Sequence, residues 1–105
     1  MEERRREARV PSVLDAIWHA QSGASRCRVT DLSWHGCFVQ SVALPGYDDE
    51  TSLTISVGNT DVRIRGRVRY VEPLMGFGFG FSEVTDRQLD ALAAVIGPRV
   101  RFLPA

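Results

Sequence analysis

The sequence predicts a mainly β protein: a small antiparallel barrel of five or six strands with one α-helix on its end. Along most of the chain, short segments of alternating polar and apolar residues are separated by turn residues. Only one segment, near the C-terminus, has clear helical spacing. A length of 105 residues is enough for a single domain with one hydrophobic core.

The strongest strand signal is the alternation in residues 62–70. Because successive side chains of a strand point to opposite faces, this segment has two distinct sides. One side is predicted to carry Arg63, Arg65, Arg67 and Arg69, and the other Val62, Ile64, Gly66, Val68 and Tyr70. Shorter strands are expected at 26–30, 37–42 and 53–57, and a last one at 76–82, where Phe77, Phe79 and Phe81 share a face.

Residues 10–20 fit two structures. A helix would place Val13, Leu14, Ile17 and Trp18 on one side. A strand would instead place Leu14, Ala16, Trp18 and Ala20 on one face. Local spacing leaves both interpretations open.

One helix is expected at about 85–97. Thr85 and Gln88 have the spacing of a capping box at its start. The apolar residues that follow recur at helical spacing, at Leu89, Leu92, Ala93 and Ile96. Gly97 and Pro98 are expected to end it.

The composition narrows the class of protein. Hydrophobic residues make up 44% and charged residues 25%, which excludes a disordered chain, a collagen-like repeat and a disulfide scaffold. No apolar run approaches the roughly 18 residues of a membrane span, and the start MEERRREAR offers no apolar stretch for a signal peptide. Cys27 and Cys37 lack metal or redox spacing, so we expect buried, reduced thiols in a cytoplasmic protein. The 13 basic residues, all Arg, balance 13 acidic ones, which argues against nucleic-acid binding by bulk charge.

Nothing in the sequence predicts an enzyme. His19 and His35 are the only histidines, and neither has a partner at metal-ligand spacing. Ser33 is two residues from His35, but no Asp is placed to orient the imidazole as a catalytic triad requires. The acidic run at 48–50 lies in a predicted loop, where we expect solvated carboxylates. No cofactor is predicted.

Two short motifs carry the functional signal. Arg5-x-x-x-Arg9 lies in residues 1–9, a charged segment that we expect to be a flexible arm. Asp31-x-Ser33-x-x-Gly36 lies between two predicted strands, where its side chains suit a tight turn with Gly36 at positive φ. Each motif alone is weak.

Both motifs in this order resemble the PilZ family, a bacterial receptor domain for the second messenger cyclic di-GMP. The likeness continues through the strand at 65–71, the GFGFGFSEV segment and the closing helix at 85–96. It implies a six-stranded split barrel over residues 10–105, with 10–20 as its first strand. His35 stands where members often carry Gly, which is a small departure from the pattern.

The resemblance also implies a ligand site. Arg5 and Arg9 would bind guanine bases and phosphates, because an Arg fork matches both the O6/N7 edge of guanine and a phosphate. Asp31 would accept hydrogen bonds from guanine, while Ser33 and Gly36 would support the contact. Arg4 and Arg6 are also expected to bind ligand. Arg4 precedes the first motif and is the residue type that accompanies an intercalated ligand dimer in the family.

The expected mechanism is an arm that closes over the barrel mouth when cyclic di-GMP binds, near Trp34 and Trp18. A monomer or weak dimer would then act through an unidentified downstream protein. The main alternative is a PilZ-like module that binds proteins but no nucleotide. A third reading, single-stranded nucleic-acid binding by the arginine face of 62–70, is weakened because that face lacks interleaved aromatic residues. We therefore expect no DNA, RNA or membrane partner.

Overall fold

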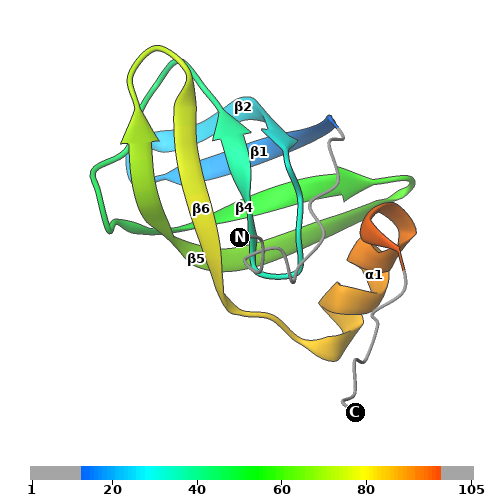
Figure 1. Ribbon diagram of the computed structural model, residues 1–105. Coiled ribbons are helices and arrows are strands. Elements are labelled where there is room, and N and C mark those ends of the chain that lie inside the picture. Colours follow the sequence, from blue (N-terminus) through cyan, green and yellow to red (C-terminus); the bar gives the residue numbers. More distant parts are fainter. Residues whose placement is uncertain (1–12, 98–105) are drawn as a thin grey trace, which may run out of the picture.

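The computed structural model describes residues 13–97, which form a closed six-stranded antiparallel barrel followed by one helix (Figure 1). The strands are β1 (Leu14–Ala20), β2 (Gly23–Thr30), β3 (Gly36–Gln40), β4 (Glu50–Val57), β5 (Thr60–Glu72) and β6 (Gly76–Glu83). Their order around the barrel is β1-β2-β3-β6-β5-β4, and β4 closes the barrel by pairing with β1. The predicted fold class is confirmed.

Strand β1 resolves the ambiguity of the first apolar segment. Ala16 and Trp18 point inward and are buried, whereas Ile17 between them is 39% exposed. The Trp18 ring packs against Phe77 with 5.0 Å between ring centroids, and its Nε1 donates to Thr51 Oγ1 at 3.0 Å. Burial therefore follows the period of a strand. Trp18 is therefore a core residue with only 5% of its surface exposed.

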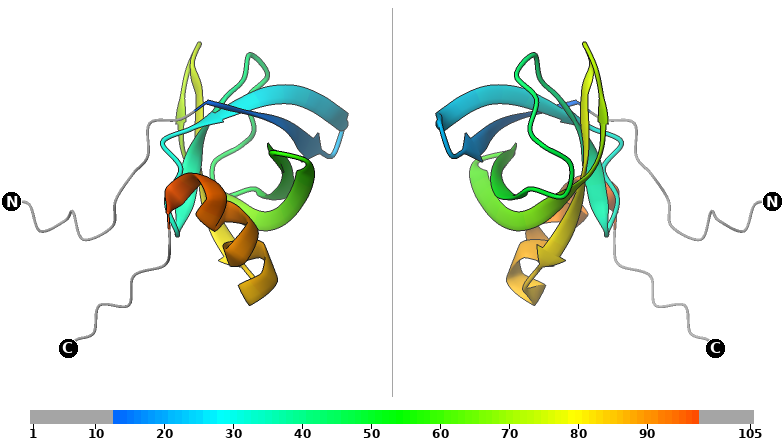
Figure 2. Two further views of the ribbon diagram at one scale, coloured as in Figure 1. Left: turned by 90° about the vertical axis from the view of Figure 1, so that its right-hand side faces the viewer. Right: turned by 90° about the vertical axis from the view of Figure 1, so that its left-hand side faces the viewer.

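The helix α1 (Asp86–Ile96) begins and ends where the sequence predicts. Gln88 N donates to Thr85 Oγ1 at 3.1 Å, and Thr85 N donates to Gln88 Oε1 at 2.9 Å, which completes the capping box. Gly97 ends the helix at a φ of 101°. Leu92 is fully buried, and α1 packs on β4 and β5 at one end of the barrel (Figure 2).

A β-bulge changes the predicted faces of β5. Val68 pairs with Phe79 and Tyr70 pairs with Gly78, so Arg69 is an extra residue on its strand. Beyond this bulge the inward–outward alternation is reset, and Tyr70 is 46% exposed. The prediction that Tyr70 shares the inner face with Val68 is wrong for this reason.

The arginines before the bulge face outward, as predicted, beside acidic residues in the loop before β4 and at its first position. Arg65 Nη2 lies 3.8 Å from Glu50 Oε2, and Arg67 Nη1 lies 3.6 Å from Asp48 Oδ1. Exposed pairs of this kind stabilise a fold by about 0–1 kcal/mol each. Their main effect here is to neutralise much of the positive charge that a nucleic-acid surface would need.

Both cysteines are free thiols. Burial raises the pKa of Cys27 from 9.0 to about 11, and burial together with the nearby Cys27 raises that of Cys37 further. Across residues 13–97, no helix is long and apolar enough to span a bilayer. Within the same range, no group of three or more His, Cys, Asp or Glu could hold a metal ion.

Candidate functional site

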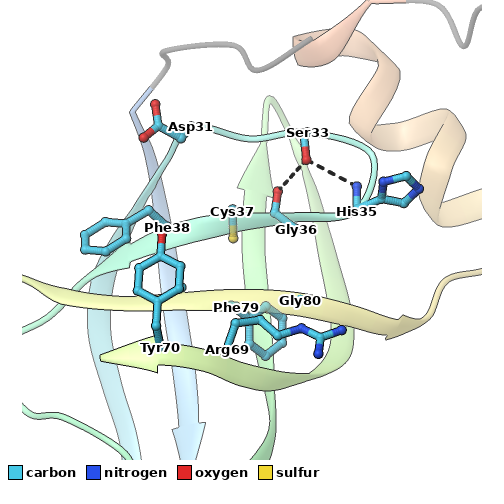
Figure 3. Close-up of a pocket in the computed structure, with 11 residues that line it drawn as sticks. Asp31, Ser33, His35, Gly36, Cys37, Phe38, Arg69, Tyr70, Phe79 and Gly80 are labelled. Atoms are coloured by element: carbon cyan, nitrogen blue, oxygen red, sulfur yellow. Dashed lines mark hydrogen bonds between the residues drawn. The ribbon is translucent and has the colours of Figure 1, made fainter. Parts of the chain in front are cut away.

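The loop between β2 and β3 is a tight turn organised by Ser33. Ser33 N donates to Gly36 O at 2.9 Å, and Ser33 Oγ donates to the same carbonyl at 3.2 Å (Figure 3). His35 N in turn donates to Ser33 Oγ at 3.2 Å. Ser33 is only 6% exposed, so its hydroxyl holds the turn together from inside. These hydrogen bonds agree with the expectation that Ser33 suits a tight turn.

Gly36 is required by close packing rather than by its backbone angles. A Cβ at this position would collide with the main-chain carbonyl of Phe79 on β6. The expectation that Gly36 adopts a positive φ is wrong, and Asp31 takes that conformation instead, at 49°. Asp and Asn tolerate such a φ better than most residues. The turn is anchored to β6 by Phe81 N, which donates to His35 O at 2.8 Å.

A shallow pocket of about 250 Å³ lies beside this turn, over the outer face of β3, β5 and β6. Its floor is formed largely by small residues, because Gly36, Gly78 and Gly80 present no side chain. The bulge in β5 sends two consecutive side chains over that floor: Tyr70 covers Gly78 and Arg69 covers Gly80. The pocket is therefore bordered by an aromatic ring on one side and a guanidinium on the other (Figure 3).

Two aromatic rings stack at one end of the pocket. Phe38 on β3 and Tyr70 on β5 lie with ring centroids 6.2 Å apart and planes inclined by 27°. Tyr70 keeps 46% of its surface exposed. A flat ligand could extend this stack, since offset aromatic stacking is favourable by about 0.5–1.5 kcal/mol beyond area burial.

Asp31 and Arg69 are the two oppositely charged side chains that line this pocket. Within the part of the chain that the structure describes, no carboxylate lies at ion-pairing distance from Arg69 and no cation pairs with Asp31. Arg65 and Arg67 on the same strand, by contrast, both contact Glu50. A guanidinium and a carboxylate thus remain available at one pocket.

The structure brings Asp31, Ser33 and Gly36 together at this pocket, as the motif predicts. The other predicted site residues lie outside the described range of 13–97, namely Arg4, Arg5, Arg6 and Arg9. Sequence reasoning missed Phe38, Arg69 and Tyr70. The spaced glycines of β6 were the available signal, since they leave one outer face of the sheet without side chains.

The sequence was compared with models of known protein families. A family model described as the PilZ domain matches residues 3–97. The chain belongs to the PilZ domain family. PilZ domains are generally receptors for cyclic di-GMP, and they are binding domains rather than enzymes. A search of curated proteins found no match to this PilZ chain.

Proposed function

We propose that this PilZ domain binds cyclic di-GMP at the turn 31–36 and the adjoining outer face of β3, β5 and β6. The observation that supports this most directly is that the carboxylate of Asp31 and the guanidinium of Arg69 line the same glycine-floored pocket. Both groups are available to a ligand. A pocket of this kind suits a flat, polar base better than a bulky apolar ligand.

The chemistry of these groups favours guanine over adenine. Asp31 can accept hydrogen bonds from N1–H and the exocyclic amine of guanine, a pair of donors that adenine lacks. An arginine fork can donate to O6 and N7, whereas adenine presents a donor in place of O6. Tyr70 and Phe38 add a stacking platform that does not discriminate between bases.

Arg5 and Arg9 complete the proposed site from the segment that precedes β1. We propose that their guanidinium groups contact guanine edges and phosphates, with Arg4 and Arg6 adding charge. Cyclic di-GMP carries two phosphate charges, and an intercalated dimer carries four. An arginine-rich segment offsets that repulsion, so Arg4 favours binding of a ligand dimer.

Signalling would follow from a change in residues 1–9. Closing this arm over the ligand costs conformational entropy, which the charge-assisted contacts must exceed. The new position of the arm would then be the feature that a downstream protein reads. Amide exchange of residues 4–10 with and without ligand tests this step, and equal protection in both states would exclude it.

Titration calorimetry of the full chain with cyclic di-GMP tests the binding itself, with cyclic di-AMP and GTP as controls. Saturable binding of cyclic di-GMP alone is the expected result, at one or two ligands per chain. A folded protein that binds none of the three would contradict the proposal and favour the alternative, a PilZ domain that recognises only proteins.

A further inference from the structure

The turn between β5 and β6 contains Leu74, a residue whose presence there is not explained by the stability of the fold. Met75 N donates to Glu72 O at 3.0 Å, which closes a four-residue turn with Pro73 and Leu74 at its centre. Leu74 has a φ of 72°. A turn with Pro at its second position and a positive φ at its third is of type II, where Gly or Asn is preferred. Leu at this position is strained.

The side chain of Leu74 gains no compensating contact, because it is 96% exposed. Its neighbours add to the apolar surface. Met75 is 57% exposed, and Val42 in the loop after β3 is 97% exposed. Ser41 N donates to Met75 O at 3.2 Å, which holds the loop after β3 against this turn. Leu74 and Met75 lie in the β5–β6 turn and Val42 lies in the loop bonded to it, and we call these three residues the apolar tip. Figure 1 shows the β5–β6 hairpin projecting from the barrel.

We propose that this apolar tip is a docking element for a partner protein with a concave apolar pocket and a basic rim. The inference does not depend on nucleotide binding. A backbone strain and a solvent-exposed apolar side chain at the same residue both disfavour Leu74 in the isolated domain. Such a residue is expected where an interaction outside the domain favours it.

Shape and area favour a concave partner over a second copy of the chain. The tip is convex, and its three side chains expose far less than the roughly 800 Å² that each partner buries in a stable complex. Two tips facing each other could not reach that area. A partner pocket that surrounds the tip can bury the whole turn and the residues beside it. Leu74 would then be the central anchor residue of the interface.

The negative charge of Glu72 favours a basic rim on the partner pocket. Glu72 opens the turn and is exposed, and no cation of residues 13–97 lies at ion-pairing distance from it. A basic group on the rim of the partner pocket would satisfy this carboxylate. The same charge disfavours an anionic bilayer as the occupant, because membrane-binding loops normally combine apolar and basic residues.

The first test is stability, measured on the full chain. Leu74→Asn should raise the melting temperature by about 3–6 °C, because Asn tolerates the positive φ. Val13→Asn is the control: it replaces another exposed apolar side chain by Asn at a site without positive φ, and it should shift the midpoint by less than about 1 °C. An unchanged or lower midpoint for Leu74→Asn would overturn the proposal, because Leu74 would then be explained by folding.

The second test identifies and measures the partner. A photo-crosslinking amino acid replaces Leu74 in cells that naturally express the chain, and Asn59 in the β4–β5 turn serves as the control position. The protein captured only at position 74 is purified and titrated with the full chain. Leu74→Asn should weaken this binding at least 10-fold, Glu72→Gln should weaken it about 3- to 10-fold, and Val13→Asn should leave it unchanged.

Three outcomes would overturn the docking proposal. The first is no crosslink at position 74 above the level at position 59. The second is capture of a second copy of the chain, with self-association that Leu74→Asn abolishes. The third is binding of the full chain to phosphatidylglycerol vesicles that depends on Leu74. Repeating the titration with and without cyclic di-GMP separates this proposal from that of the nucleotide site.

Discussion

The α-carbon of Gly36 packs against the main-chain carbonyl of Phe79, at the point where the turn 31–36 joins the barrel. Any larger residue at position 36 must separate β3 from β6. We expect Gly36→Ala to lower the free energy of unfolding by about 2–4 kcal/mol, since neither main chain can move without losing ladder hydrogen bonds. Urea denaturation measures this change.

Gly46→Ala is the control for that variant. Its added methyl group would meet only the flexible carboxylate of Asp49, at 3.1 Å. A cost below about 1 kcal/mol is expected there. Equal costs at positions 36 and 46 would mean that close approach of strands is not what requires Gly36.

The second prediction concerns the two arginines that precede the barrel. Arg5→Ala and Arg9→Ala should each weaken cyclic di-GMP binding by about 1.5–3 kcal/mol, which is roughly 10- to 150-fold. Lysine should restore little at either position, because an ammonium cannot make the two-pronged contact of a guanidinium. Calorimetry on each variant provides the measurement, and full affinity in both alanine variants would rule out this site.

Asp31 allows the role of its charge to be separated from its backbone conformation. Asp31→Asn keeps a residue that tolerates the φ of 49°, so the stability of the fold should not change. Asp31→Asn and Asp31→Ala should both weaken cyclic di-GMP binding about 10-fold or more, since the carboxylate acceptor is lost. If the Asn variant binds as tightly as the native chain, Asp31 acts through the turn and not through guanine.

The fourth prediction tests the residues that the bulge presents. Tyr70→Ala should weaken cyclic di-GMP binding by about 1–3 kcal/mol through lost stacking, and Arg69→Ala by a comparable amount. Arg63→Ala is the matched control on the same strand, because Arg63 bonds to Ser52 away from the pocket. The assignment fails if Arg63→Ala reduces affinity as much as Arg69→Ala does.

The fifth prediction follows from the buried thiols. A free thiol ionises near pH 9.0, whereas the pKa of Cys27 in the fold is about 11. As the pH rises, the Cys27 thiol therefore loses its proton in the unfolded chain before it does so in the folded one. Its contribution to the free energy of unfolding is complete below pH 9 and declines as the pH rises toward 11. The slope per thiol cannot exceed about 1.4 kcal/mol per pH unit.

Urea denaturation between pH 7 and about 10.5 tests this dependence. The free energy of unfolding should fall less steeply with pH in Cys27→Ala than in the native chain. A parallel decline in both proteins would assign the alkaline loss to other groups, such as the tyrosines.

Most of the barrel could be predicted because its signals are local. The alternation of buried Ile64 with exposed Arg63 and Arg65, and the capping box of Thr85 and Gln88, depend on neighbours within four residues. The strand assignment of 10–20 came from the resemblance. Local spacing could not decide it, since Trp18 fits either pattern.

The errors at the site have a non-local cause. The bulge at Arg69 depends on how β5 pairs with β6. The sequence pattern within β5 alone does not indicate where this bulge lies. The packing of Gly36 likewise depends on a carbonyl of Phe79 in a distant strand. The family was predicted from the two motifs, whereas the surface next to the turn 31–36 depends on how separate strands pair.

The pairing of β3 with β6 also determines when the turn 31–36 can form during protein synthesis. Strand β3 has five paired residues with β6 but only three with its sequence neighbour β2. Gly36 meets Gly80, which the ribosome adds 44 residues later. Before β6 has left the ribosome, the turn lacks the strand that holds His35 and Gly36 in place. At the proposed site, a nascent chain therefore cannot bind cyclic di-GMP until β6 is available and the barrel is complete.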